Sequence, residues 1–236
     1  MLKARTKLTP TSARTREHLI LAGERLFAEQ GLDNVSLRQI NSEAGQRNSS
    51  ASHYHFGSKE SLVTAIYEYR FQNLNKRRNA MLAALPPTED ARPVSTLMEL
   101  LVFPIVEEID NSEGGNHFIR FMAQVLGHPK SSLVEFWRTQ FDGSVGHVYY
   151  GLRKALPDIP DEVFGPRFGL TWILAVNGLA DRQRLSEIHE RLVACTRPAL
   201  YFANLVDVLS SVMSAPPSPS TLSEIRKLRT RGEHRT

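Results

Sequence analysis

Apolar residues recur every three or four positions along most of the chain, a spacing that places them on one side of an α-helix. From Arg14 to Gln30 they fall on one helical face, and Gly31 ends that helix. The chain is therefore expected to be all-α. The same spacing predicts further helices over residues 36–44, 49–55, 58–85, 94–109, 117–126, 131–156, 161–179 (interrupted at 165–166) and 198–214, with an irregular connection over 181–195.

Three short helical segments are packed into residues 36–62. Ser36 and Gln39 have the spacing of a capping box, and the Gly45 that follows is typical of a helix end. Asn48 suits the first position before a second helix, and Ser58 suits the same position before a third. Two short helices joined by a tight Gly-containing turn form a helix-turn-helix, whose second helix fits the major groove of DNA. The pattern alone also fits a pair of helices in some other all-α domain.

The second of these helices has the side chains that such a role requires. Its residues are small or polar, so nothing bulky would block approach to base edges, and cationic or phenolic side chains beside it suit phosphates. The candidate DNA-binding residues are Ser36, Arg38, Arg47, Asn48, Ser49, Ser50, Ser52, His53, Tyr54 and Lys59.

A wider stretch, residues 15–67, resembles the DNA-binding domain of the TetR family of transcriptional regulators, above all in the segments SLRQINSEAG and YHFGSKESL. The resemblance implies that Tyr54 and Lys59 contact phosphates and that His55 helps to fix the end of the recognition helix. The chain departs from the family at two points: the turn over residues 46–48 looks one residue longer, and Ser52 stands where many members carry an apolar residue.

The distribution of charge agrees with a DNA-binding N-terminal part. Residues 1–80 hold 13 Lys and Arg against 7 Asp and Glu, whereas residues 81–215 hold 11 against 16. A basic unit on an acidic body indicates a polyanionic partner. A membrane surface would attract the same charges, but they do not follow one long amphipathic helix, so double-stranded DNA is the better interpretation.

Composition argues against secretion, a membrane span and catalysis. The single cysteine, Cys195, excludes an intrachain disulfide and fits the cytoplasm, and no apolar run approaches the roughly 20 residues of a membrane span. The histidines are scattered without metal-ligand spacing, so no metal and no cofactor are expected. No nucleophile, phosphate-binding or dinucleotide motif is present, which predicts a protein that is not an enzyme. An all-α small-molecule carrier or enzyme with an incidental helix-turn-helix is the alternative.

The resemblance also implies a body that binds a small molecule and forms a homodimer. The body is poor in charge and rich in aromatic residues, which favours an apolar or aromatic ligand, although each such residue also suits an ordinary core. Asn177 is polar within an apolar run, and its amide would meet a ligand, a second subunit or its own helix. The candidate ligand-binding residues are Phe103, Phe118, Phe121, Met122, Trp137, Phe141, Tyr149, Trp172 and Asn177, and the candidate dimer residues are Leu170, Tyr201, Leu205, Val208 and Val212.

Four segments follow from these observations. They are a flexible basic arm (1–13), a helix-turn-helix domain (14–60), a helical effector-binding and dimerisation domain (61–214) and a mobile tail (215–236). The expected function is transcriptional regulation: a repressor that binds a palindromic operator as a dimer and leaves it when a small apolar or aromatic ligand binds.

Overall fold

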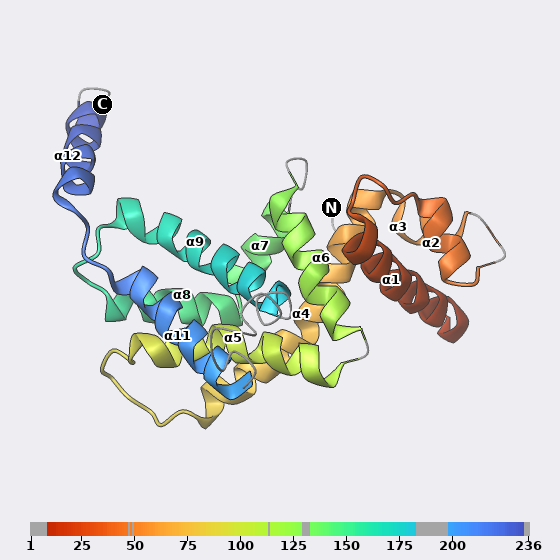
Figure 1. The fold of residues 1–236 in the computed structure, drawn as a ribbon, viewed down its shortest axis with the longest axis horizontal. Coiled ribbons are helices and arrows are strands. Elements are labelled where there is room, and N and C mark those ends of the chain that lie inside the picture. The colour runs from red at the N-terminus through yellow and green to blue at the C-terminus, as the bar shows by residue number, and fades with distance from the viewer. Residues whose placement is uncertain are drawn as a thin grey trace, which may run out of the picture. The chain divides into compact units, whose positions relative to one another are not determined.

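The computed structural model is built from α-helices, as predicted (Figure 1). It describes residues 9–46, 48, 50–112, 114–128, 133–182 and 198–233, and within these residues it contains no β-strand. The helices are α1 (Pro10–Gln30), α2 (Leu37–Glu43), α3 (Ala51–Phe56), α4 (Lys59–Ala84), α5 (Val94–Asn111), α6 (Gly115–Gly127), α7 (Val134–Phe141), α8 (Ser144–Ala155), α9 (Asp161–Ala180), α11 (Pro198–Ser214) and α12 (Pro219–Glu233).

The helices divide into two compact units. The first consists of residues 1–83 and 103–144, which include α1–α4, the second half of α5, and α6 and α7. In this unit α1 packs against α2, α3 and α6. The second unit consists of residues 84–102 and 145–236, and there α11 packs against α9.

Helix α1 begins earlier than the sequence suggests. Its first residue is Pro10, and the Thr9 side chain accepts a hydrogen bond from the Ser12 backbone N–H at 3.3 Å. Proline is favoured in a first turn because its missing N–H would have no partner there, so a Thr-Pro pair is a strong start signal. The expected flexible arm over residues 1–13 is therefore wrong for residues 10–13. Residues 1–8 lie outside the described part.

The sequence also misplaced helix ends in the body. The single helix expected over residues 131–156 is two, α7 and α8, because the chain turns at Asp142 and Gly143, whose N–H groups donate to Arg138 and Gln140 carbonyls. The interruption expected at residues 165–166 is absent, and α9 runs through Pro166. The connection expected over residues 181–195 falls largely on 183–197, outside the described residues, and with it Cys195.

The tail is the largest correction to the fold. Residues 219–233 form α12, whose first turn is capped by Ser218: its Oγ accepts the Thr221 N–H at 3.2 Å. The Arg229 guanidinium donates to both carboxylate oxygens of Glu162 at the start of α9, at 2.6 and 3.0 Å. The Pro- and Ser-rich start was interpreted as a tail, but it serves as a cap followed by a first-turn proline.

Membrane-spanning potential was tested helix by helix over the described residues. No single helix there is long and apolar enough to cross a membrane, while α11 and α12 taken together as a bent pair pass by length and composition. Within that pair, Phe202, Leu205 and Leu209 of α11 are buried in the second unit, as expected for a core helix.

Candidate nucleic-acid interface and ligand pocket

The predicted capping box forms at the start of α2. The Ser36 N–H donates to Gln39 Oε1 at 2.8 Å, and the Gln39 N–H donates back to Ser36 Oγ at 3.3 Å. After α2 the chain turns through Gly45, whose φ of +65° lies in the left-handed region that favours glycine. Gly57, with φ of +77°, ends α3 in the same way. These caps and glycines fix the length and direction of both short helices.

A buried amide holds α3 against α2. Asn41 is 2% exposed, and its Oδ1 accepts the Ser52 N–H at 2.8 Å and the Ser52 hydroxyl as well. Ser52 is 0% exposed, so the prediction that it faces DNA is wrong. It occupies the position where family members often carry an apolar residue, and Asn41 supplies the polar partner that burial of a serine requires.

The opposite side of α3 is open to solvent. His53 is exposed, and Tyr54 is 79% exposed, which is unusual for so large a side chain. Asn48 and Ser50 are exposed before the helix, and Asn48 Oδ1 accepts the Ser50 N–H at 2.9 Å. The helix begins at Ala51 with Ser50 as its N-cap, two residues later than predicted. Ser36 and Arg38 at the start of α2 are exposed too, whereas Arg47 and Ser49 lie outside the described residues.

The charge of this face does not come from His55. Burial lowers the pKa of His55, and the nearby Arg16 lowers it further, so the ring is neutral near pH 7. The Arg16 guanidinium lies 5.2 Å from the centre of the Phe56 ring, a cation–π contact that joins α1 to the end of α3. The Arg16–Phe56 contact therefore holds the end of α3 against α1.

Lys59 is used inside the domain. Its ammonium donates to the Leu32 carbonyl at 2.7 Å and to the Val35 carbonyl at 3.1 Å, so it ties the start of α4 to the loop between α1 and α2. These two carbonyl oxygens accept two of the three N–H groups of the ammonium, and the predicted phosphate contact of Lys59 stays a prediction.

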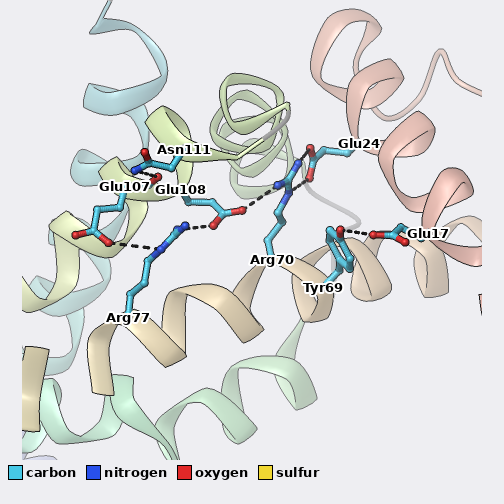
Figure 2. A network of polar contacts seen from close by, with 8 residues as sticks. All are labelled: Glu17, Glu24, Tyr69, Arg70, Arg77, Glu107, Glu108 and Asn111. Atoms are coloured by element: carbon cyan, nitrogen blue, oxygen red, sulfur yellow. Dashed lines mark hydrogen bonds and ion pairs between the residues drawn. The ribbon is translucent and has the colours of Figure 1, made fainter. Parts of the chain in front are cut away.

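Figure 2 shows a buried network in the first unit, with Arg70 of α4 between Glu24 of α1 and Glu108 of α5. Arg70 donates to both oxygens of Glu24 at 2.6 and 2.8 Å, and to one oxygen of Glu108 at 2.8 Å. Arg77, two turns further along α4, donates to the other oxygen of Glu108 at 2.5 Å. Glu24, Arg70 and Glu108 are 1%, 2% and 0% exposed, so two carboxylates and one guanidinium group are buried together, and the partly exposed Arg77 supplies the second positive charge.

The pKa values of the network reflect both burial and pairing. Burial raises the pKa of Glu24, and its hydrogen bond to Arg70 opposes that rise. Burial acts to lower the pKa of Arg70, but its hydrogen bonds to Glu24 and Glu108 outweigh burial and raise it. Breaking the network would leave charged groups buried without their partners, so the network makes the separation of α1, α4 and α5 costly.

An open pocket of about 520 Å³ lies in the first unit at the C-terminal end of α6 and along α7. Its volume falls in the usual range for small-molecule sites. We call it the α6–α7 pocket, and it is lined by Val125, Leu126, His128, Leu133, Trp137, Arg138 and Phe141. His128 Nε2 lies 3.1 Å from Asp33 Oδ1 in the loop before α2, so one residue of the lining also contacts the helix-turn-helix.

The predicted ligand-binding residues are divided between the two units. Trp137 and Phe141 line the α6–α7 pocket. The other five lining residues were not predicted from the sequence. Phe118, Phe121 and Met122 are fully buried in the first unit, and Phe103 is half-buried there. Tyr149, Trp172 and Asn177 belong to the second unit. There the Tyr149 ring lies 5.2 and 5.1 Å from the rings of Phe164 and Phe168, and the exposed Asn177 amide donates to the Ile173 carbonyl at 2.9 Å.

The predicted dimer residues also divide into two kinds. Leu205 is buried within its own chain, so placing it at a subunit interface is wrong. Tyr201 is half-buried and donates its hydroxyl proton to the Gly178 carbonyl of α9 at 2.6 Å, and its place at an interface stays a prediction. Val212 is half-buried. Leu170 and Val208 are 60% and 40% exposed. Three further exposed apolar residues, which the sequence analysis missed, lie on the same two helices: Ile173, Leu174 and Leu200.

Comparison with known proteins gives matches in both parts of the chain. Residues 19–66 match the family model described as bacterial regulatory proteins, tetR family. Residues 99–211 match the model described as Tetracyclin repressor-like, C-terminal domain. The HTH-type transcriptional regulator AcrR of Shigella flexneri is 32% identical over 88 residues, which are 37% of this chain and 39% of that protein. The aligned stretch thus spans about two fifths of that relative.

One of the matching solved structures supports the fold. A protein assigned to the tetR family of transcription regulators, from Shewanella sp. PV-4, aligns with a TM-score of 0.54 at 19% identity, over 82% of this chain and 97% of that one. A TetR-family regulator from Streptomyces coelicolor aligns with a TM-score of 0.47 at 18% identity, over 88% of this chain and 99% of that one. At this identity the first structure supports the all-α fold and nothing finer.

Proposed function

The chain belongs to the TetR family of transcriptional regulators, and from that premise we propose that it is a cytoplasmic repressor that binds a palindromic operator as a homodimer. An apolar or aromatic small molecule releases it. Three features of the described residues support this proposal: the exposed face of α3, the exposed apolar face of α9 and α11, and the contacts that join the α6–α7 pocket to the helix-turn-helix.

The exposed face of α3 is the observation that carries the proposal. A six-residue helix that leaves His53 and Tyr54 in solvent, while Ser52 is clamped from behind, has one side reserved for an external partner. His53 and the exposed Asn48 and Ser50 have side chains that hydrogen-bond to base edges, and the Tyr54 hydroxyl suits a phosphate. We assign α3 to the major groove, with Arg38 of α2 toward the backbone.

A dimer follows from the geometry of DNA recognition. One helix-turn-helix reads one half-site, and two half-sites lie about 34–36 Å apart on one face of the duplex. The apolar face formed by Leu170, Ile173 and Leu174 of α9 with Leu200 and Val208 of α11 is exposed in the single chain. Side chains of this kind are usually covered, and a second copy of the same face would cover them under two-fold symmetry.

Release by a ligand requires that the ligand prefer one conformation of the DNA-reading part. Moving the equilibrium from 99:1 to the reverse needs a preference of about 5.5 kcal/mol. The α6–α7 pocket offers a route for such a preference, since His128 lines it and also contacts Asp33 ahead of α2. Helix α4 offers another, because Lys59 at its start holds the same loop and Arg70 further along holds α1.

The test is binding to the duplex that flanks the protein's own gene. Fluorescence anisotropy with excess unrelated DNA as competitor should show saturable binding by the wild-type chain and loss of selectivity for His53→Ala. Asn73→Ala, a change at an exposed residue of α4 outside the helix-turn-helix, is the matched control and should bind like wild type. Equal affinity for flanking and unrelated DNA would favour an all-α carrier instead.

A further inference from the structure

Tyr67 of α4 carries a buried hydroxyl that has no hydrogen-bond partner in the part of the chain that the structure describes. The residue is 1% exposed. Burial raises the pKa of Tyr67, so the hydroxyl keeps its proton and remains a donor wherever the protein is folded. Leaving such a group unsatisfied is unfavourable, and phenylalanine would fill the same space without that cost. The hydroxyl therefore requires an explanation outside the fold.

Five aromatic rings lie around the Tyr67 ring. Its ring centre lies 5.2 Å from that of Phe136, 5.4 Å from Phe121 and 5.8 Å from Phe71. Most of these rings meet at tilted or edge-to-face angles, the arrangement that aromatic pairs prefer. A flat aromatic molecule entering this cluster would find edges and faces on several sides and one hydrogen-bond donor.

Trp137 connects this cluster to the α6–α7 pocket. Its ring lies 6.3 Å from the Tyr67 ring and 5.7 Å from the Phe71 ring, and the same side chain lines the pocket. Trp137 is half-buried, so one side of it faces the opening. The pocket of about 520 Å³ and the buried aromatic cluster thus share the Trp137 side chain.

The rim of the pocket argues against a charged ligand. His128 Nε2 lies 3.1 Å from Asp33 Oδ1, and Arg138 Nη1 lies 3.2 Å from Glu135 Oε2. Both basic groups thus already face carboxylates of this chain. An anionic ligand would have to compete with them, whereas a neutral one would not.

We propose that the α6–α7 pocket binds a neutral, flat aromatic molecule with one hydrogen-bond-accepting oxygen, which accepts the proton of the Tyr67 hydroxyl after Trp137 moves aside. This inference rests on the proposed function, in which a small molecule controls the regulator, and it names the class of ligand and the residue that recognises it. Tyr67 lies on α4 between Lys59 and Arg70, so a molecule bound there touches the helix that holds the DNA-reading part.

Two probes that differ by one oxygen, 2-naphthol and naphthalene, test the inference by calorimetry on the whole chain. The wild type should bind 2-naphthol about tenfold more tightly than naphthalene, the effect of one buried hydrogen bond. Tyr67→Phe should bind both probes equally and melt at the same or a higher temperature. Thr171→Val is the matched control: it removes another buried hydroxyl without a hydrogen-bond partner among the described residues, on α9 of the second unit, and should keep the tenfold difference.

A tenfold difference that survives in Tyr67→Phe, or a wild-type chain that binds neither probe, would overturn the inference. Release of the operator is measured separately, so that a failure of the Tyr67 site can be distinguished from a failure of ligand control. Tyr67-dependent binding of 2-naphthol without release of DNA would uphold this site and contradict ligand control through it. Release of DNA by a molecule whose action is the same in Tyr67→Phe would contradict this site and uphold ligand control.

Discussion

Tyr67 and Arg70 lie about one turn apart on α4, and both are buried. They differ in the hydrogen bonds that their polar groups make. Arg70 has carboxylate oxygens from Glu24 and Glu108 within 2.8 Å. The Tyr67 hydroxyl has no hydrogen-bond partner among the described residues. A buried polar group with all its partners inside the fold serves the fold, whereas one left without them points to a partner from outside.

The same contrast separates other neighbours along the chain. Leu205 is buried against its own chain while Val208, one turn later, is exposed. Ser52 is clamped by Asn41 while His53, the next residue, is open to solvent. Substituting the inward member of each pair should lower stability, and substituting the outward member should change binding.

The largest effect is expected for Arg70→Met. It would leave the Glu24 carboxylate buried without its cation and deprive Glu108 of one of its two, so the free energy of unfolding should fall by about 3–5 kcal/mol. Urea denaturation followed by circular dichroism measures this loss. Arg77→Met is the control: Arg77 is partly exposed and leaves Arg70 in place, so it should cost clearly less. Equal losses for the two variants would show that the network does not centre on Arg70.

The second effect compares Leu205 with Val208. Leu205→Ala opens a cavity between α11 and α9 and should cost about 2–5 kcal/mol of unfolding free energy. Val208→Glu places a charge on the exposed apolar face, and it should yield folded monomers in sedimentation velocity without changing the helical content. A Val208→Glu chain that still sediments as a dimer would remove α11 from the proposed interface.

The third comparison is between Lys59 and Arg38. Lys59→Ala removes a cation that holds two loop carbonyls, so it should lower unfolding free energy by about 1.5 kcal/mol. Arg38→Ala, at an exposed position, should leave stability unchanged and reduce the slope of log affinity against log salt by about one. If Lys59→Ala instead reduces that slope with no loss of stability, the side chain leaves its carbonyls when DNA binds.

The smallest effect is expected for Ser52→Ala. Asn41 would still accept the hydrogen bond from the backbone N–H of residue 52 and would lose only the one from the hydroxyl. The free energy of unfolding should therefore fall by about 0.5–1.5 kcal/mol. Operator preference should be the same as in the wild type, because Ser52 is buried and does not reach the exposed face of α3 that is proposed to meet DNA. An altered preference in a variant of normal stability would contradict this placement.

Local signals in the sequence predicted the helix-turn-helix well. The capping box at Ser36, the turn at Gly45 and the cap at Ser58 depend on residues within a few positions of each other, and all three formed. The Thr9-Pro10 start and the Ser218-Pro219 start carry equally local signals, but their polar surroundings resembled flexible ends. Helix spacing alone did not reveal the break at Gly143 inside an apolar run.

Partners that come from distant parts of the chain could not be predicted in the same way. Glu24 falls between Gly23 and Leu26 on the apolar face of α1, and a charge in that position signals a buried pair without identifying Arg70 as its partner. Lys59 belongs to a specific motif, yet only the fold shows that its ammonium reaches Leu32 and Val35. The sequence likewise marks Tyr201 and Leu205 as one apolar stripe with Val208, and only packing against α9 separates them.

The most direct test of the central claim, that α3 reads DNA as part of a dimer, is selection of bound duplexes from a random pool, sequenced for wild type and for His53→Ala. The account predicts a palindromic consensus for the wild type with half-sites about one helical turn apart, and for His53→Ala a changed preference at the same position in both half-sites. No enriched sequence for the wild type, or an identical consensus for the variant, would contradict it.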